Sequence, residues 1–414
     1  MSCEENNPSK GQVRLRDYES IVGASAIENL RILAARLKGR SIQNINSTAV
    51  GGGVAEILNR MVPLLKDLGL DARWDLICGE ERFFQVTKKF HNALHGRRED
   101  ISGADFDVFI QASRENIKNV DTRRDIVFVH DPQPIALIEK KRGNKWIWRC
   151  HIDVSRPNEK VWSFLEKFVL RYDASVFSAS AFSRKLPIRQ FLISPSIDPL
   201  SDKNKELPGS VIDSVLEKYG IPRDRPIITQ ISRFDYLKDP LGVICAYKQV
   251  RKYIDCRLIL AGGAAADDPQ SSEVLSRVRE SARGDGDIHI LLLPHDDITV
   301  NALQRASTII LQKSLREGFG LTVAEALWKG KPVVASHVGG IPLQIKHKYS
   351  GLLCHSVDGA AFAIKQLLNS PEYAARLGQN GREHIRNNFL LTRHLREYIL
   401  LFLSLYHSQD VVYL

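Results

Sequence analysis

The sequence predicts an α/β protein with two domains, each built on a parallel β-sheet. The chain has 414 residues, which is too long for one compact domain and fits two. Short apolar runs alternate with longer amphipathic segments, as expected for strands that alternate with helices. This alternation is interrupted at residues 194–208, where three prolines and many polar residues indicate a linker.

The first half of the chain contains five short apolar runs that predict strands. Between the first two runs, residues 54–67 predict a helix, because Leu58, Met61 and Leu65 recur at helical spacing. Residues 83–96 predict a second, amphipathic helix. The predicted strands are 41–46, 74–78, 106–111, 125–130 and 146–152.

The second half repeats this alternation after the linker. From residue 371 onward the pattern is helical only. Open parallel sheets bind ligands beyond the carboxyl ends of their strands, so functional residues are expected there in both domains. The predicted strands are 226–231, 257–261, 288–292, 308–311 and 332–335.

The composition narrows the classes of function. A hydrophobic content of 43% excludes general disorder. The net charge of +10 fits an enzyme with phosphorylated substrates or a solvated basic surface. No aromatic-interleaved basic stripe is present, so nucleic-acid binding is not expected. The most apolar stretch, 398–406, is too short to cross a membrane, and none of the six cysteines forms a CxxC pair. We therefore expect a soluble, cytoplasmic protein with reduced thiols that does not bind membranes.

A run of three glycines, Gly51 to Gly53, lies between the first predicted strand and the first long helix. Glycines let the backbone approach a ligand closely, and a helix N-terminus favours anions. The run matches neither the dinucleotide-binding nor the P-loop pattern, and a simple tight turn is an equal alternative.

Two strands of the first domain are predicted to end in ionisable residues. One runs into Asp131 and Gln133, and the other into His151 and Asp153. For Asp153 we favour capping of the next helix. For Asp131 and His151 we favour binding of sugar hydroxyl groups, with capping by Asp131 as the alternative.

Two motifs follow strands of the second domain. Arg233 and Lys238 share one strand-end loop, where both cations can converge on a diphosphate. The segment Gly318-Phe319-Gly320-Leu321-Thr322 opens a helix, so its amides can hold a phosphate. Glu317 and Glu325 flank it, and we expect both carboxylates to take sugar hydroxyl groups, with solvent exposure of Glu325 as the alternative.

A metal site is not expected. His91 and His95 stand four residues apart on the helix predicted for 83–96, but no third ligand accompanies them.

The arrangement of Arg233, Lys238, Glu317 and Glu325 resembles the donor site of retaining GT-B glycosyltransferases of the glycogen-synthase-like family 4. The segment EGFGLTVAEAL is specific for that family, and the likeness covers nearly the whole chain. The segments NSTAVGGGVAEIL, FVHDPQP and WIWRCHIDVSRPN are similar to its trehalose-forming members. Trehalose phosphorylases share several of these segments.

The resemblance implies a GT-B fold, with two Rossmann-like domains that face each other across a cleft. Residues 1–200 would bind the acceptor and residues 201–385 the nucleotide-sugar donor. Residues 386–414 would form a helix that packs back on the first domain. It also implies a homodimer and no required cofactor, although stimulation by Mg²⁺ through the donor diphosphate stays open.

The resemblance also assigns the site residues. Arg233 and Lys238 would neutralise the leaving diphosphate, Glu317 and the amides of residues 318–322 would hold the donor glucose, and Glu325 would hold the ribose. Gly52 and Gly53 would approach the donor phosphate and sugar. Asp131, Gln133 and His151 would bind the acceptor, with His151 also near the reacting carbon.

The implied activity is transfer of glucose from ADP- or UDP-glucose to free glucose, which makes trehalose; its reversibility is left open. The alternatives are a trehalose phosphorylase, another family-4 transferase with a different acceptor, and a non-catalytic sugar-nucleotide sensor.

Overall fold

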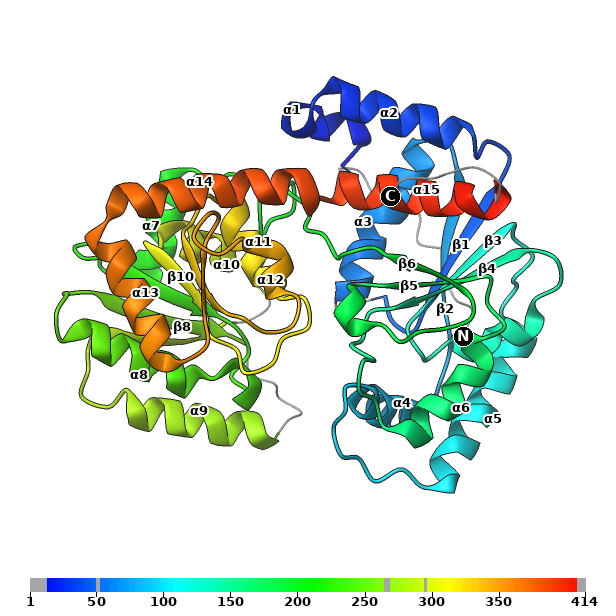
Figure 1. Ribbon diagram of the computed structural model, residues 1–414, viewed down its shortest axis with the longest axis horizontal. Coiled ribbons are helices and arrows are strands. Elements are labelled where there is room, and N and C mark those ends of the chain that lie inside the picture. The colour runs from blue at the N-terminus through cyan, green and yellow to red at the C-terminus, as the bar shows by residue number, and fades with distance from the viewer. Residues whose placement is uncertain (1–12, 50–52, 264–268, 294–295, 408–414) are drawn as a thin grey trace. The chain divides into compact units, whose positions relative to one another are not determined.

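The computed structural model describes residues 13–49, 53–263, 269–293 and 296–407 (Figure 1). Contacts within the chain divide it into two compact units. The N-terminal unit comprises Met1–Pro195 and Leu391–Leu414, and the C-terminal unit comprises Ser196–Leu390. The units therefore divide at 195/196 and 390/391, whereas the boundaries drawn from the sequence lie at 200/201 and 385/386.

The N-terminal unit contains a parallel sheet, as predicted, and this sheet has six strands. Its strand order is β2-β1-β3-β4-β5-β6. Two of its strands, β5 and β6, were not predicted, because neither forms a run of adjacent β-branched residues. The strands are β1 (Ser41–Asn46), β2 (Asp71–Leu76), β3 (Ile126–His130), β4 (Lys145–Cys150), β5 (Ala174–Phe177) and β6 (Arg189–Leu192).

Helices cover both faces of this sheet (Figure 1). On one face α4 (Glu81–Leu94), α5 (Gly103–Asn119) and α6 (Glu159–Val169) bury a core that includes Trp146 and Trp148. On the other face lie α2 (Ala24–Ala35), α3 (Gly53–Asp67) and α15 (Leu391–Tyr406), and α15 contacts both α2 and α3. The ring of Phe128 in β3 lies 4.9 Å from the ring of Tyr398 in α15, so this last helix packs on the second face of the sheet.

The strand predicted for 106–111 is wrong, because these residues lie within α5. A capping box begins this helix: the Asp105 amide donates to Ser102 Oγ, and the Ser102 amide donates to Asp105 Oδ2. Phe109 is fully buried, while Asp107 lies on the opposite side of the same turn. The apolar residues therefore follow the period of a helix rather than that of a strand.

The C-terminal unit contains a second six-stranded parallel sheet, in the order β12-β11-β10-β7-β8-β9. Five of its strands match the predicted ones to within one residue at each end, and the short strand β12 was not predicted. The strands are β7 (Ile227–Ile231), β8 (Arg257–Gly262), β9 (Ile288–Leu292), β10 (Ile309–Gln312), β11 (Val333–Ser336) and β12 (Leu352–Cys354).

Helices also pack on both faces of the second sheet. One core contains side chains of α8 and α13, and another contains side chains of α7 and α10. Of the described residues from 371 onward, nearly all lie in the helices α14 and α15, as predicted. The helices are α7 (Gly209–Lys218), α8 (Pro240–Arg251), α9 (Pro269–Ser281), α10 (Asp297–Ala306), α11 (Leu321–Trp328), α12 (Ile341–Gln344), α13 (Val357–Asn369) and α14 (Pro371–Asn388).

Parallel register brings the carboxyl ends of neighbouring strands together in each unit. In the N-terminal sheet His130 is the partner of Arg149, and Cys150 is the partner of Phe177. The residues that follow these strands share one edge of the sheet, which is where the candidate site residues lie. Among the described residues, no helix is long and apolar enough to cross a membrane.

Candidate active site

Lys238 and Glu317 form an ion pair at the carboxyl edge of the second sheet. Lys238 follows β7 and Glu317 follows β10, and these two strands are neighbours. The Nζ atom of Lys238 lies 2.6 Å from Oε1 and 2.7 Å from Oε2 of Glu317. The side chains are only 17% and 9% exposed. The sequence predicted that Lys238 binds the diphosphate and that Glu317 binds sugar hydroxyl groups. In the structure the two side chains bind each other directly.

Further donors hold the Glu317 carboxylate in place. The Ser314 hydroxyl donates to Oε2 over 3.0 Å, and the Gln312 amide lies 3.4 Å from the same oxygen. The backbone carbonyl of Lys238 accepts from Gln230 over 2.9 Å. A carboxylate fixed by three neighbours presents its remaining acceptor capacity in a defined direction.

A second ion pair, between Lys313 and Asp239, lies beside the first and was not predicted from the sequence. Lys313 is buried, and its amide donates to Gln230 Oε1. Asp239 has a left-handed backbone with φ of 46° and caps α8 through the Gly242 amide. An aspartate before proline is a recognisable helix start, but nothing local indicates its partner 74 residues away.

Arg233 lies in the same strand-end loop but is paired differently. Its side chain is 65% exposed and lies 3.2 Å from Asp235. Lys238, in contrast, is held by Glu317. The two cations have separate carboxylate partners in this structure, so their convergence on one diphosphate stays a prediction.

The turn that opens α11 is shaped by glycines. Gly320 is the residue before the helix and has φ of 80°, in the left-handed region. The Gly340 amide donates to the Gly318 carbonyl over 2.7 Å. A Cβ on Gly339 would lie 1.9 Å from the Glu317 carbonyl oxygen, so this close approach requires glycine. Phe319 is buried against Phe389, which makes it a packing residue of the turn.

The helix α11 carries the other predicted donor residues. Leu321 and Thr322 are half-buried in its first turn, and the Thr322 hydroxyl lies 3.4 Å from Gln312 Oε1. Glu325 is 5% exposed, which excludes the alternative that it is solvated. Lys329, one turn later, donates to the Glu325 backbone carbonyl over 3.1 Å. Burial lowers the pKa of Lys329, and the Glu325 charge opposes that shift.

In the N-terminal unit, His130, Asp131 and His151 meet at the ends of β3 and β4. The rings of the two histidines are stacked, with 3.2 Å between His130 Nδ1 and His151 Nε2. The other nitrogen of His130 lies 3.1 Å from Asn44 Oδ1. The Asp131 carboxylate accepts the His151 amide over 2.9 Å. Asp131 has φ of 64° and does not cap a helix, so the capping alternative for it is wrong.

Burial keeps these histidines neutral. Burial and the Arg149 charge lower the pKa of His130 to about 3, and the same causes hold the pKa of His151 well below its ordinary value. Burial raises the pKa of Asp131 to about 6, against the opposing effects of the His151 amide and Arg149. Near neutral pH this edge therefore presents one carboxylate and two uncharged imidazoles.

Arg149, which the sequence did not single out, lies fully buried beneath these residues. Its guanidinium donates to the carbonyl oxygens of Ile193, over 2.7 Å, and Phe177, over 3.3 Å. In the described part of the chain no carboxylate forms an ion pair with it. The residue stands in an apolar strand, WIWRC, and a buried arginine has no sequence signal of its own there.

The structure bears differently on the four other residues named from the sequence, which are Gly52, Gly53, Gln133 and Asp153. Gly53 begins α3, whereas Gly52 lies outside the described residues. Gln133 is half-buried, and its Oε1 atom is buried without a hydrogen-bond partner within the described chain. Asp153 accepts the Ser155 amide in a turn while Asn158 caps α6, so the helix-capping interpretation of Asp153 is wrong. No group of three metal-ligating side chains occurs among the described residues.

Comparison with known proteins identifies the family. Residues 44–184 match the family "Trehalose synthase, N-terminal domain", and residues 211–384 match "Glycosyl transferases group 1". A trehalose synthase of Pyrococcus horikoshii is 42% identical over 407 residues, which cover 96% of this chain and 98% of that protein. The chain belongs to the trehalose synthase family. It is thus a glycosyltransferase of trehalose metabolism.

Two more distant proteins complete the comparison. A trehalose phosphorylase of Pleurotus pulmonarius is 29% identical, over 90% of this chain and 58% of that protein. A solved UDP-forming α,α-trehalose-phosphate synthase from Burkholderia xenovorans superimposes with a TM-score of 0.70 at 16% identity, covering 90% of this chain and 100% of that one. The likeness of the solved structure confirms the predicted GT-B fold of two Rossmann-like domains.

Proposed function

We propose that the chain transfers glucose, with retention of configuration, from a nucleoside diphosphate glucose to free glucose and thereby forms trehalose. The observation that carries the proposal is the ion pair of Lys238 and Glu317, in a glycosyltransferase of the trehalose synthase family. A fixed cation beside a fixed carboxylate suits a ligand that joins a diphosphate to a sugar. A helix N-terminus preceded by Gly318 and Gly320 adds amide donors for the same ligand.

In this proposal Lys238 and Arg233 bind the diphosphate, and Glu317 with the amides of residues 318–322 binds the donor glucose. Glu325 is assigned to the ribose hydroxyl groups. Gly52 and Gly53 are assigned to the donor phosphate and sugar. Any stimulation by Mg²⁺ would act through the donor diphosphate, without a protein ligand.

The acceptor is assigned to the N-terminal unit. Asp131 and Gln133 accept hydrogen bonds from glucose hydroxyl groups, and His151 lies near the reacting carbon. The neutral state of the two histidines supports this assignment, because an uncharged sugar offers hydroxyl groups and no charge to compensate. The Oε1 atom of Gln133 is buried and has no hydrogen-bond partner within the described chain, so its acceptor capacity is unused.

The reaction is a displacement on one face of the donor sugar. The bond from C1 to the diphosphate oxygen breaks while the acceptor hydroxyl oxygen bonds to C1 on the same face. The acceptor proton passes to the departing phosphate oxygen. Negative charge grows on the diphosphate, and preorganised cations such as Lys238 lower the barrier because they are already in place.

The test is the reverse reaction, with trehalose supplied together with UDP, ADP or inorganic phosphate in separate tubes. Nucleotide sugar formed only with UDP or ADP supports the proposal and identifies the base. The forward reaction of glucose with each donor glucose nucleotide completes the test. No trehalose in the forward reaction and no product in the reverse one would refute it.

A trehalose phosphorylase is the second candidate, favoured by the match to the Pleurotus enzyme. In that case glucose 1-phosphate would form only in the tube with phosphate, and Lys238 and Arg233 would bind a phosphate ion. The lower identity of this match, 29% against 42%, makes it the weaker candidate.

A further inference from the structure

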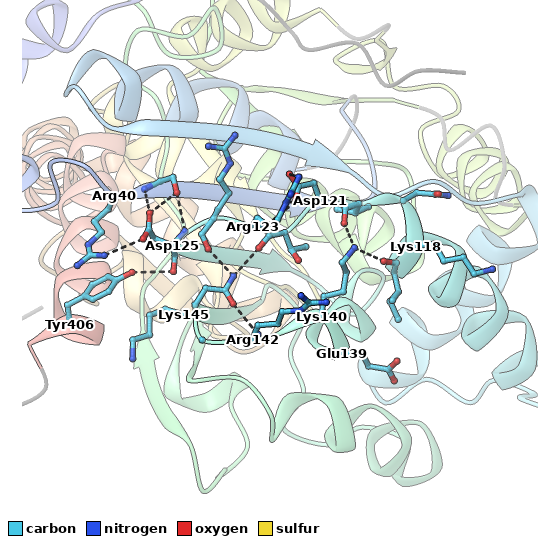
Figure 2. A pocket seen from close by; sticks show the side chains of 18 residues that line it. Arg40, Lys118, Asp121, Arg123, Asp125, Glu139, Lys140, Arg142, Lys145 and Tyr406 are labelled. Carbon is cyan, nitrogen blue, oxygen red and sulfur yellow. Dashed lines mark hydrogen bonds and ion pairs between the residues drawn. The ribbon is translucent and has the colours of Figure 1, made fainter.

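A basic depression lies at the opposite edge of the N-terminal sheet from the candidate active site. It has a volume of about 970 Å³ and is lined by the segments that precede β1, β3 and β4, with the last residue of α15 at its rim (Figure 2). Strands of five or six residues separate the two edges, which is a distance of about 17 Å. The depression is therefore a separate feature of this unit.

Its lining concentrates positive charge. Seven basic and three acidic side chains give a formal charge of +4, out of +10 for the whole chain. The basic residues are Arg40, Lys118, Arg123, Arg124, Lys140, Arg142 and Lys145, and the acidic ones are Asp121, Asp125 and Glu139.

Several of these cations have structural roles. Arg40 pairs with Asp125 and lies over the Tyr406 ring, and Arg123 pairs with Asp121. Lys140 donates to the carbonyls of Ile117 and Val120, over 2.6 Å each, at the end of α5. A lysine there compensates the negative end of the helix. Structural compensation therefore explains part of the charge.

Arg142 and Lys145 are not explained in this way. They stand in the loop before β4 and at its first residue, and Figure 2 shows both side chains at the depression. Among the described residues neither side chain has a carboxylate or carbonyl partner. Two cations that stand three residues apart in the sequence and line one concave basic surface are suited to an anion with more than one charge.

We propose that this depression binds a small phosphorylated metabolite with two or more negative charges. The three carboxylates interspersed among the cations, which include the exposed Glu139, oppose a long polyanion, because such a ligand binds along a continuous row of cations. A small ligand can contact Arg142 and Lys145 and avoid these carboxylates. A nucleotide, a sugar phosphate and pyrophosphate share the required chemistry.

The test is a calorimetric titration of the full chain with pyrophosphate at fixed ionic strength. The background is Lys238→Gln, which removes the cation proposed for the donor diphosphate and keeps an amide donor toward Glu317. We expect this chain to bind pyrophosphate, and the added substitutions Arg142→Ala and Lys145→Ala to weaken binding at least tenfold. The matched control, Arg82→Ala with Lys167→Ala, removes two exposed charges of the same unit and should leave binding unchanged.

Three outcomes would overturn the proposal: absence of binding to the background chain, unchanged binding after loss of Arg142 and Lys145, or equal weakening by the control pair, which would mean diffuse attraction. Titrations with ADP and glucose 6-phosphate then distinguish the sources of phosphate. Single-stranded DNA that binds at the same residues, with affinity rising with its length, would contradict a small ligand.

Discussion

The two units place chemically opposite clusters at the same position of the same kind of sheet. The C-terminal cluster, Lys238, Glu317, Lys313 and Asp239, consists of two ion pairs. The N-terminal cluster, His130, Asp131, Arg149 and His151, has no ion pair within the described residues. Its histidines are neutral, and the pKa of its carboxyl group is raised.

The same kind of sheet therefore carries two edges of different chemistry. Parallel strands fix where the side chains stand, and the chemistry of each edge follows from the residues placed there. An ionic edge suits a charged diphosphate, whereas an edge of two uncharged imidazoles and one carboxylate suits the hydroxyl groups of a sugar.

Loss of Lys238 should have the largest effect on activity. We expect Lys238→Ala to lower kcat/KM, because a charge fixed next to the leaving group is removed. The expected loss of transition-state stabilisation is about 2–4 kcal/mol. Steady-state kinetics of trehalose formation measures this loss. Lys252→Ala, which removes an exposed lysine after α8, is the control. A kcat/KM close to that of the unchanged chain would remove the diphosphate role of Lys238.

Asp131→Asn should raise stability and abolish most of the activity. Because the folded pKa of about 6 lies above the ordinary value of 3.8, the folded state binds more protons between these pH values. Stability is therefore lost as the pH rises through this window. The asparagine chain should gain on the order of 2 kcal/mol above pH 6 and nothing below pH 4.

Urea unfolding from pH 4 to pH 8 measures this gain. Asparagine tolerates the left-handed backbone of Asp131 and can still accept the His151 amide, so the substitution changes mainly the charge. A gain that does not vary with pH would contradict the raised pKa. Full activity of the variant would contradict the acceptor role.

Arg149→Met should destabilise the N-terminal unit by about 1–3 kcal/mol, because the carbonyls of Ile193 and Phe177 lose a buried donor. The midpoint of urea unfolding reports the change. Arg171→Met, at an exposed position of the same unit, should leave the midpoint unchanged. Equal midpoints for both variants would show that the buried arginine does not contribute to stability.

The smallest expected effect concerns the turn before α11. Gly320→Ala should cost about 1 kcal/mol, because its φ of 80° strains any side chain. A Cβ there would also lie 3.1 Å from Glu317 Cγ. Gly318→Ala is the matched control, since nothing lies within 4 Å of its added Cβ. Equal thermal unfolding of the two variants would show that the left-handed turn is not required.

The fold was largely predictable because its signals are local. Apolar runs and helical spacing located most strands of both sheets, and the exception is instructive. Residues 106–111 are apolar enough for a strand, but the capping box at Ser102 and Asp105 identifies a helix. The short strands β5 and β6 were missed because Ala-Ser-Val-Phe and Arg-Gln-Phe-Leu contain no pair of adjacent β-branched residues. The strands β10 and β11 are equally short but begin with Ile-Ile and Val-Val, which made them recognisable.

The candidate site was predictable in position but not in pairing. The sequence placed Lys238 and Glu317 each at the end of a strand. In the structure they form one ion pair, although 79 positions separate them in the sequence. Lys313 and Arg149 were missed for the same reason. Their importance comes from burial and from partners distant in the sequence, and neither is visible in local spacing.

The division of ligands between the two clusters is tested most directly by calorimetric binding of UDP and ADP to three chains: the unchanged one, Lys238→Ala and Asp131→Asn. If the C-terminal cluster binds the diphosphate, Lys238→Ala should weaken binding of the preferred nucleotide at least tenfold, while Asp131→Asn should bind it as the unchanged chain does. Unchanged binding by Lys238→Ala, or loss of binding by Asp131→Asn, would contradict this division.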